Sequence, residues 1–303
     1  MAAIFRGTRG VRRETMAVRR RNPRATKRVR RKQVGRAAQR VRDALARPPV
    51  ARATPYLGLV RAPSSPPECG PMRRRISVAT YNVHRWTGRN GRSAPDPARA
   101  GSVISELHAD VIALQEVLRP HRGDDPLEAI AEALGLHVAF ACARAHKRGE
   151  LGNAILSRWP MRGVSVFDIS FSRVERRLAM GAQFPFEGGV LDVVATHLSL
   201  GDRTRHLQVR SLLDNPYLQA GPTLLLGDMN AWRQCKATRT LDDELHNNHD
   251  WPASFPAARP VLALDRIYAR GVKVGKVEAH QSRAAQSASD HLPVVAHVEL
   301  PVS

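Results

Sequence analysis

The feature that most constrains the fold is a succession of short apolar runs, which begins at Ile76 and continues almost to the C-terminus. Most of these runs have the length of a strand rather than of a helix. The predicted strands are Ile76–Tyr81, Asp110–Gln115, His137–Ala143, Asn153–Ser157, Gly163–Ile169, Leu178–Phe184, Val190–Leu198, Thr223–Gly227, Val261–Ala269, Val272–Ala279 and Pro293–Leu300. Helices are predicted over Pro97–His108, Pro126–Leu134, Arg203–Leu213 and Lys236–Leu245. Many consecutive strands with few crossover helices predict two packed sheets flanked by helices.

The positive charge of the chain is concentrated before these runs. The net charge is +21, yet residues 1–75 hold 22 of the 48 Lys and Arg residues and 3 of the 27 Asp and Glu residues. Apolar residues are too sparse in the Arg-rich segment 1–47 to define a core face, so disorder is expected there. Residues 48–71 are rich in Pro, Ala and Ser, which is typical of a linker. We therefore predict a basic extension over residues 1–71 and a nearly neutral catalytic domain over residues 72–303.

Polar side chains follow several of the apolar runs at the point where each run ends. They are Asn82 and His84, Gln115 and Glu116, His197, Asp228 and Asn230, Asp265, and the pair Asp290 and His291. Any one of them alone is more typical of a turn, a solvated strand end or a core histidine. Side chains at the ends of neighbouring strands converge on one edge of a sheet, however, and sites form at such edges.

This set of residues suits hydrolysis assisted by a metal. Its oxygen groups, which come from Asn82, Glu116, Asp228, Asn230 and Asp290, suit Mg²⁺ or Mn²⁺ rather than Zn²⁺. A divalent cation polarises a phosphoryl oxygen and stabilises the leaving oxyanion. His291 would activate water or hold the phosphate, with Asp265 fixing its tautomer. Either arginine of the pair Arg176–Arg177 could bind a phosphate oxygen.

Six short motifs occur in an order that resembles the endonuclease/exonuclease/phosphatase superfamily. They are TYNVH at Thr80–His84, LQE at Leu114–Glu116, THL at Thr196–Leu198, GDMN at Gly227–Asn230, LDRIY at Leu264–Tyr268 and SDHLP at Ser289–Pro293. The superfamily includes pancreatic-type deoxyribonucleases, abasic-site nucleases, neutral sphingomyelinases and inositol-polyphosphate phosphatases. The resemblance implies a four-layer α/β/β/α sandwich of two mixed sheets, with a divalent metal at the sheet edge. A finer resemblance, carried by Val83–Arg92, Gly152–Arg158 and Gly227–Arg233, is to a compact bacterial subgroup whose substrates are poorly defined.

The resemblance also implies a role for each residue. Glu116 is similar to the principal metal ligand, with Asn82 beside it and Asp290 close to the metal. Asp228 resembles the group that aligns or deprotonates the attacking water, and Asn230 its phosphate-binding companion. His291 resembles the essential histidine that Asp265 orients. His197 resembles the second histidine of the deoxyribonuclease and sphingomyelinase branches, and Arg176 or Arg177 the arginine near the scissile phosphate.

Several questions remain open on the sequence alone. The expected substrate is a phosphate ester, either nucleic acid or a phospholipid headgroup, and a phosphomonoester is the alternative. The basic extension could bind nucleic acid or an anionic membrane, could be a mitochondrial transit peptide, or could arise from a misplaced translation start before Met72. A binding protein acting through this arm is the competing function. Three scattered cysteines without a CxxC pair fit a reducing compartment, and no apolar signal segment is present, so we expect a cytoplasmic protein with peripheral membrane contact as an option. We also expect a monomer.

Overall fold

The computed structural model describes residues 55–67, 70–171, 175–245 and 250–302. These residues belong to one compact unit, Ala53–Ser303. The predicted disorder of the arm concerns residues that lie outside the described part of the chain. Among the described residues, no helix combines the length and apolar character needed to cross a bilayer.

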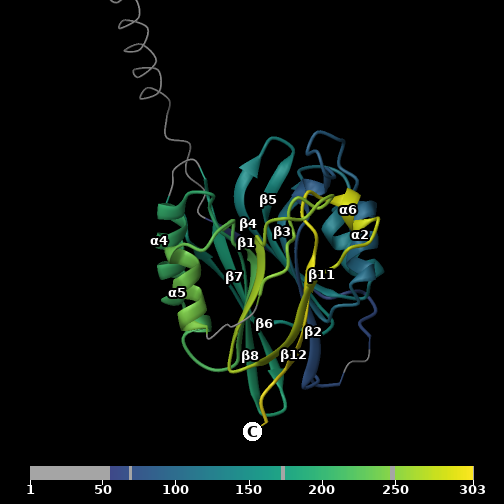
Figure 1. Ribbon diagram of the computed structural model, residues 1–303. Helices are drawn as coiled ribbons and strands as arrows, with labels where there is room; N and C mark the ends of the chain where they lie inside the picture. The colour runs from purple at the N-terminus through teal and green to yellow at the C-terminus, as the bar shows by residue number, and fades with distance from the viewer. Residues whose placement is uncertain (1–54, 68–69, 172–174, 246–249, 303) are drawn as a thin grey trace, which may run out of the picture. The chain divides into compact units, whose positions relative to one another are not determined.

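The described strands form two sheets (Figure 1). The seven-stranded sheet has the order β1-β4-β5-β3-β2-β12-β11. Its strands are β1 (Tyr56–Arg61), β2 (Arg75–Asn82), β3 (Val111–Pro120), β4 (His137–His146), β5 (Gly149–Ser157), β11 (Lys273–Ala279) and β12 (Val294–Glu299). The five-stranded sheet has the order β10-β9-β8-β7-β6. Its strands are β6 (Arg162–Asp168), β7 (Leu178–Phe186), β8 (Gly189–His197), β9 (Thr223–Asp228) and β10 (Asp265–Arg270).

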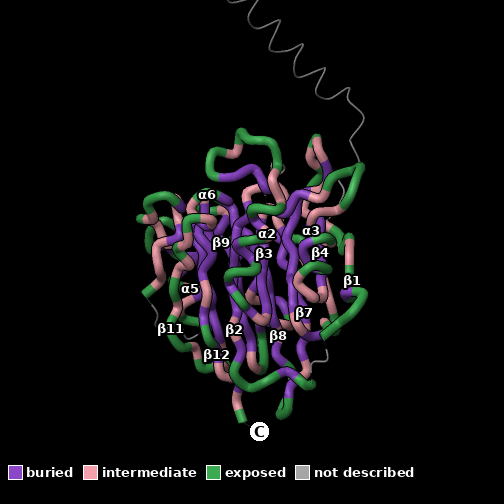
Figure 2. Tube along the Cα trace, turned by 90° about the vertical axis from the view of Figure 1, so that its right-hand side faces the viewer, coloured by how far each residue is buried: buried purple, intermediate pink, exposed green. Residues whose placement is uncertain are grey.

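Helices cover the outer face of each sheet, and the two inner faces pack against each other. The helices α2 (Pro97–Glu106), α3 (Pro126–Ala133) and α6 (Ala285–Ala288) share a core with the seven-stranded sheet. The helices α4 (Asp202–Leu213) and α5 (Lys236–Glu244) share another with the five-stranded sheet. A third core lies between the sheets, and the central strands are buried along most of their length (Figure 2). The four-layer α/β/β/α sandwich is thereby confirmed.

The alternation of side chains along the strands explains why both faces are apolar. In β2, Ile76 and Val78 belong to the core between the sheets, whereas Ala79 and Tyr81 face the helical layer. The same division separates Leu224 and Leu226 of β9 from Leu225. Successive side chains of a strand point to opposite faces, so a central strand that is covered on both sides reads as a continuous apolar run.

Two predicted boundaries were wrong. The stretch 48–71 was expected to be a linker, but β1 lies within it and pairs antiparallel with β4. Five of its six residues are exposed at the sheet edge, including Tyr56 and Leu57, so no apolar run marked it as a strand. The strand predicted over Val261–Ala269 begins only at Asp265, because the preceding residues form an isolated bridge in which Leu262 faces Phe255.

Candidate active site

The directions of the strands bring the predicted residues to one edge of the sandwich. β2 runs parallel to β3, and β8 runs parallel to β9, so Asn82, His197 and Asp228 all lie at the carboxyl ends of strands. β10 and β12 run antiparallel to β9 and β2, so Asp265 and the residues before Val294 start at the same edge. A hydrogen bond of 3.1 Å from Asn82 Nδ2 to Asp228 Oδ2 joins the two sheets there.

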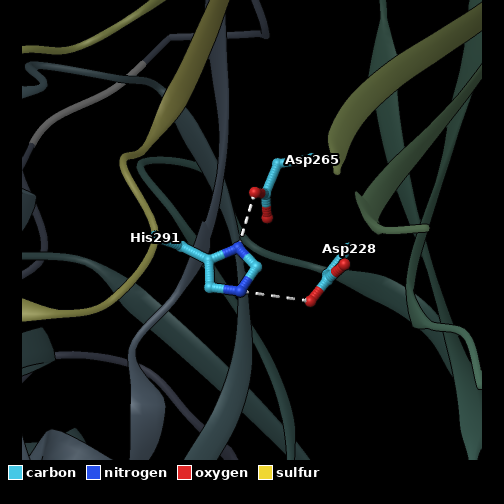
Figure 3. Close-up of side chains that lie close together, drawn as sticks. All are labelled: Asp228, Asp265 and His291. Carbon is cyan, nitrogen blue, oxygen red and sulfur yellow. Dashed lines mark hydrogen bonds and ion pairs between the residues drawn. The ribbon is translucent and has the colours of Figure 1, made fainter. Parts of the chain in front are cut away.

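His291 lies between two buried carboxylates (Figure 3). Its Nδ1 donates to Asp265 Oδ2 over 2.7 Å, and its Nε2 lies 3.7 Å from Asp228 Oδ2. The ring also packs against Phe255, with 5.0 Å between centroids. Burial alone lowers the pKa of an imidazole, but here the charges of Asp265 and Asp228 outweigh it and raise the pKa of His291 to about 10. His291 is therefore a cation at neutral pH, and its Nε2 faces the carboxylate of Asp228.

Asp228 is the carboxylate on which the other groups of the site converge. Its Oδ1 accepts from the Asn230 backbone N–H over 2.9 Å, which requires Asn230 to turn back with φ at 50°. Asparagine is among the residues that tolerate this left-handed conformation. Burial is the main cause that raises the pKa of Asp228 to about 6, and the positive charge of His291 opposes it. A carboxylate with such a pKa is suited to accept a proton near neutral pH.

His197 stands beside Asp228 on the side away from His291. Its Nε2 lies 3.4 Å from Asp228 Oδ2, and Arg177 Nη1 lies 2.9 Å from its Nδ1. A guanidinium has no acceptor, so Nδ1 must accept and Nε2 carries the ring proton. Burial, followed by the charges of Arg177, His291 and Arg144, holds the pKa of His197 well below its usual value, so this imidazole is neutral. Asn230 Nδ2 donates to the carbonyl oxygen of Leu198 over 2.8 Å. It also lies 3.0 Å from the same Nε2, but with the ring proton on Nε2 this contact joins two donors and is not a hydrogen bond.

Arg176 and Arg177, between which the sequence could not decide, have different contacts in the structure. Arg177 contacts His197 and donates to Glu175 over 2.5 Å. Arg176 donates to Asp168 over 3.1 Å, at the end of β6. Both line the cavity next to the site, but only Arg177 touches another predicted site residue. Arg177 is therefore the arginine that is joined to the other predicted site residues.

The three predicted metal ligands lie on the seven-stranded sheet. Glu116 occupies a β-bulge between Leu114 and Val117 and has a φ of 53°. Regular alternation would turn this side chain under the helical layer, whereas the bulge directs it to the sheet edge. Asp290 follows Ser289, whose hydroxyl donates to the Asn82 carbonyl oxygen over 2.6 Å. Glu116 is close enough to Asp290 for its charge to add to burial in raising the pKa of Asp290.

The chemistry of these donors fits a divalent cation. Two carboxylates and the Asn82 amide form an oxygen set, and their neighbours are the His84 ring, 3.1 Å from Asp290, and the Arg85 guanidinium, 3.4 Å from Glu116. Donor atoms of Asp228, Asp265 and His291 also lie within 4.8 Å of one another. Both nitrogens of His291 already face carboxylates, however, and a hard cation prefers oxygen. The oxygen set of Glu116, Asn82 and Asp290 therefore suits a hard cation better than the group of Asp228, Asp265 and His291 does.

Some contacts of the site could not be predicted from the sequence. Ser254 donates its hydroxyl to Asp265 Oδ2 over 2.6 Å and is fully buried. It precedes its partner by eleven residues, across an irregular loop. His84 and Arg85 face the carboxylates from a turn in which His84, Arg85 and Trp86 all have positive φ. A short-range pattern cannot predict such contacts, because they depend on how a loop folds back over the sheet edge.

A cavity of about 330 Å³ opens beside Glu116 and His197. Its other walls come from the β4–β5 hairpin and from the segment that precedes β7. Besides Glu116, His197 and Glu175, the polar residues that line the cavity are Arg144, Asn153, Arg176 and Arg177. A larger hollow of about 460 Å³ lies at the opposite end of β2 and β12, around Arg75, Ser77 and Glu299, and includes no predicted site residue.

Comparison with known proteins places the chain among phosphoesterase-like proteins. The sequence model of the Endonuclease/Exonuclease/phosphatase family matches residues 79–291. YbhP of Escherichia coli strain K12 is 29% identical over 246 residues, which cover 74% of this chain and 96% of YbhP. An endonuclease/exonuclease/phosphatase structure from Beutenbergia cavernae is similar with a TM-score of 0.61 and 24% identity, covering 75% of this chain and 72% of the other.

A similarity also extends to an enzyme with a named substrate. The mannosyl-6-phosphatase Bt3783 of Bacteroides thetaiotaomicron matches with a TM-score of 0.57 and 16% identity, covering 74% of this chain and 99% of the other. At this identity the two proteins share the fold, and nothing about the substrate follows.

Proposed function

Because the chain belongs to the Endonuclease/Exonuclease/phosphatase family, we propose that it hydrolyses a phosphodiester with the help of Mg²⁺ or Mn²⁺. The observation that carries this proposal is the buried series Asp265, His291 and Asp228, in which a charged imidazole faces a carboxylate of raised pKa. Asp228 would accept the proton of the attacking water. His291, as a cation, would hold a phosphate oxygen instead of acting as the base.

The remaining residues would bind and orient the phosphate. Asn230 and Arg177 would donate to its oxygens from the five-stranded sheet, while His197 remains a neutral donor beside Asp228. Glu116, Asn82 and Asp290 would hold the cation, which when bound polarises the phosphoryl oxygen and stabilises the leaving oxygen. Arg205 supports this arrangement, because its buried guanidinium donates to the carbonyl oxygens of Ser199, Leu200 and Asn230.

Nucleic acid and phospholipid headgroups are the substrate classes that we propose to test, with a phosphomonoester as the alternative. The shared fold does not decide between these ester classes. A binding protein acting only through the basic arm is less consistent with a site in which every predicted residue is present.

The test is a hydrolysis screen on the full chain with bis-p-nitrophenyl phosphate, single- and double-stranded DNA, RNA, phospholipids and sugar or inositol phosphates. We expect turnover of one class that EDTA abolishes and that Mg²⁺ or Mn²⁺ restores. Glu116→Gln should lose this turnover. Glu244→Gln, an exposed carboxylate at the end of α5, is the matched control and should keep it. Turnover that survives both EDTA and Glu116→Gln would refute the mechanism.

A further inference from the structure

The cavity beside the site is built from both sheets and leads directly to the reacting groups. Glu116 and His197 form part of its wall. Arg177 also lines it, and the contact of 2.9 Å between Arg177 Nη1 and His197 Nδ1 separates the cavity from Asp228. A group seated in the cavity would therefore lie one side chain away from a phosphate held between the two histidines. The cavity could therefore hold another group of the substrate whose phosphate is bound between the two histidines.

The cavity carries more positive charge than its carboxylates neutralise. Arg176 and Arg177 have acidic partners, Asp168 and Glu175. Arg144 lines the same cavity, is exposed and forms no ion pair with any carboxylate of the described residues. Glu116, the remaining acidic residue of the wall, belongs to the cation site of the proposed mechanism. An arginine without an acidic partner on the wall of a concave site is a ready partner for a phosphate, because its guanidinium can donate two parallel hydrogen bonds.

Asn153 adds a polar group where the strand pattern calls for an apolar one. Ile155 of the same strand lies in the core between the sheets, and Asn153 is two residues away on the same face. Asn153 is only 4% exposed, yet it lines the cavity. Its Nδ2 makes one long hydrogen bond of 3.4 Å to the Leu178 carbonyl oxygen. The second hydrogen of this amide is left to donate to a bound ligand.

We propose that this cavity is a second anion subsite, in which Arg144 and Asn153 receive a phosphate that the substrate carries next to its scissile phosphate. The inference rests on the proposed function and narrows its substrate class to phosphate esters with at least two phosphate groups. Successive phosphates of a nucleic-acid strand and the phosphates of a small polyphosphorylated alcohol share this chemistry. Bis-p-nitrophenyl phosphate lacks the second group and would leave the subsite empty.

The experiment measures binding rather than turnover. The full-length protein in EDTA is titrated with thymidine 3′,5′-bisphosphate and with thymidine 5′-monophosphate. We expect the bisphosphate to bind about tenfold tighter or more, as a charge-assisted bidentate contact would give. Arg144→Gln should remove most of this preference and leave the affinity for the monophosphate unchanged. Asn153→Asp, which places a carboxylate in the cavity, should reduce the preference as well.

Lys147→Gln is the matched control, because Lys147 is an exposed cation in the same hairpin and does not line the cavity. It should bind both compounds as the unchanged protein does, and thermal denaturation should show that all variants are folded. A dinucleotide and inositol 1,4-bisphosphate, used in parallel, distinguish a strand from a small polyphosphate.

Two outcomes would overturn the subsite: a preference that Arg144→Gln and Lys147→Gln affect equally, or no measurable preference for the bisphosphate at all. Failure of the proposed function looks different. In that case the preference and its dependence on Arg144 persist, while the hydrolysis screen gives no turnover.

Discussion

At the scale of single residues, the two histidines of the site differ in charge although both are buried. His291 faces the carboxylates of Asp265 and Asp228, and these raise its pKa to about 10 despite burial. His197 faces the guanidinium of Arg177, which adds to burial in lowering its pKa. One imidazole is thus a cation and the other is neutral within one site. The sequence left open whether His291 activates water or holds phosphate, and its charge favours the second role.

Asp265→Asn tests this role. The substitution removes the negative charge that contributes most to raising the pKa of His291, so that pKa should fall and the cation should be lost near neutral pH. We expect kcat to decrease about 10²- to 10⁴-fold, the range that a positioned acid–base group contributes. Steady-state kinetics and an NMR titration of the histidine measure the two effects. Asp192→Asn, at the far end of β8, should change neither. An unchanged kcat in Asp265→Asn would contradict the assigned role.

The raised pKa of Asp228 predicts how activity depends on pH. Burial is the largest cause that shifts this pKa to about 6. Asp228 must be ionised to accept a proton, and its ionised fraction falls as the pH drops below that value. The profile of kcat/KM should therefore decline on the acid side with a midpoint near pH 6. Rates measured between pH 5 and 8 at saturating Mg²⁺ would show it. A flat profile over this range would exclude Asp228 as the base.

At the scale of elements, the sequence predicted those features that depend on local pattern. Apolar runs located the central strands, and the polar residues that end them marked the edge where Asn82, His197 and Asp228 meet. Alternation failed where the backbone departs from a regular strand. Glu116 reaches the site only through a bulge, and Ser254 reaches Asp265 only because a loop folds back. Neither departure has a signature in a run of neighbouring residues.

The missed strand β1 illustrates the same limit at an edge. It contributes few buried side chains, so its stability comes from backbone pairing with β4 and from neighbours such as the Arg61–Glu128 ion pair. Further along, Trp159 Nε1 donates to the Gly70 carbonyl oxygen over 3.1 Å. These contacts are made by residues 55–71, which carry no periodic apolar pattern. A strand of this kind forms because it pairs with a neighbouring strand, and the β-propensity of its own residues predicts it poorly.

Truncation distinguishes a domain that starts at Ala53 from one that starts at Met72. A fragment that starts at Ala53 keeps β1, whereas a fragment that starts at Met72 loses it and exposes the edge of β4. A backbone hydrogen bond contributes a net ~1 kcal/mol, and in a domain of this size each kcal/mol shifts Tm by about 2–4 °C. The shorter fragment should therefore unfold roughly 10 °C lower than the longer one. Calorimetry of both fragments measures the difference. Equal Tm values would mean that β1 contributes nothing to the domain and that residue 72 is its true start.

At the scale of the whole molecule, the site depends on both sheets at once. Asn82, Glu116 and Asp290 come from the seven-stranded side, while His197 and Asp228 come from the five-stranded side. Their contacts cross the core between the sheets, so the site forms only when the sandwich is complete. All of these residues lie in the unit Ala53–Ser303. The basic segment before Ala53 contributes none of them.

This division predicts that catalysis and charge-driven binding can be separated. Residues 1–52 hold 18 of the 48 basic residues and 2 of the 27 acidic ones. The fragment 53–303 should therefore keep the kcat of the full chain and lose most of its affinity for single-stranded DNA or anionic vesicles. Binding by such a segment releases counterions, so the affinity of the full chain should fall steeply with salt.

Fluorescence anisotropy with labelled DNA and vesicle flotation, each across a salt series, measure this affinity. The control is a full-length variant in which the basic residues of Lys27–Lys32 are replaced by Gln, which retains the length of the arm and removes part of its charge. Its affinity should lie between those of the full chain and the fragment. If the fragment binds as tightly as the full chain, the arm is dispensable for binding, and the contact surface must be sought on the domain. If the fragment instead loses turnover while remaining folded, the arm takes part in presenting the substrate, and the two activities belong to one function.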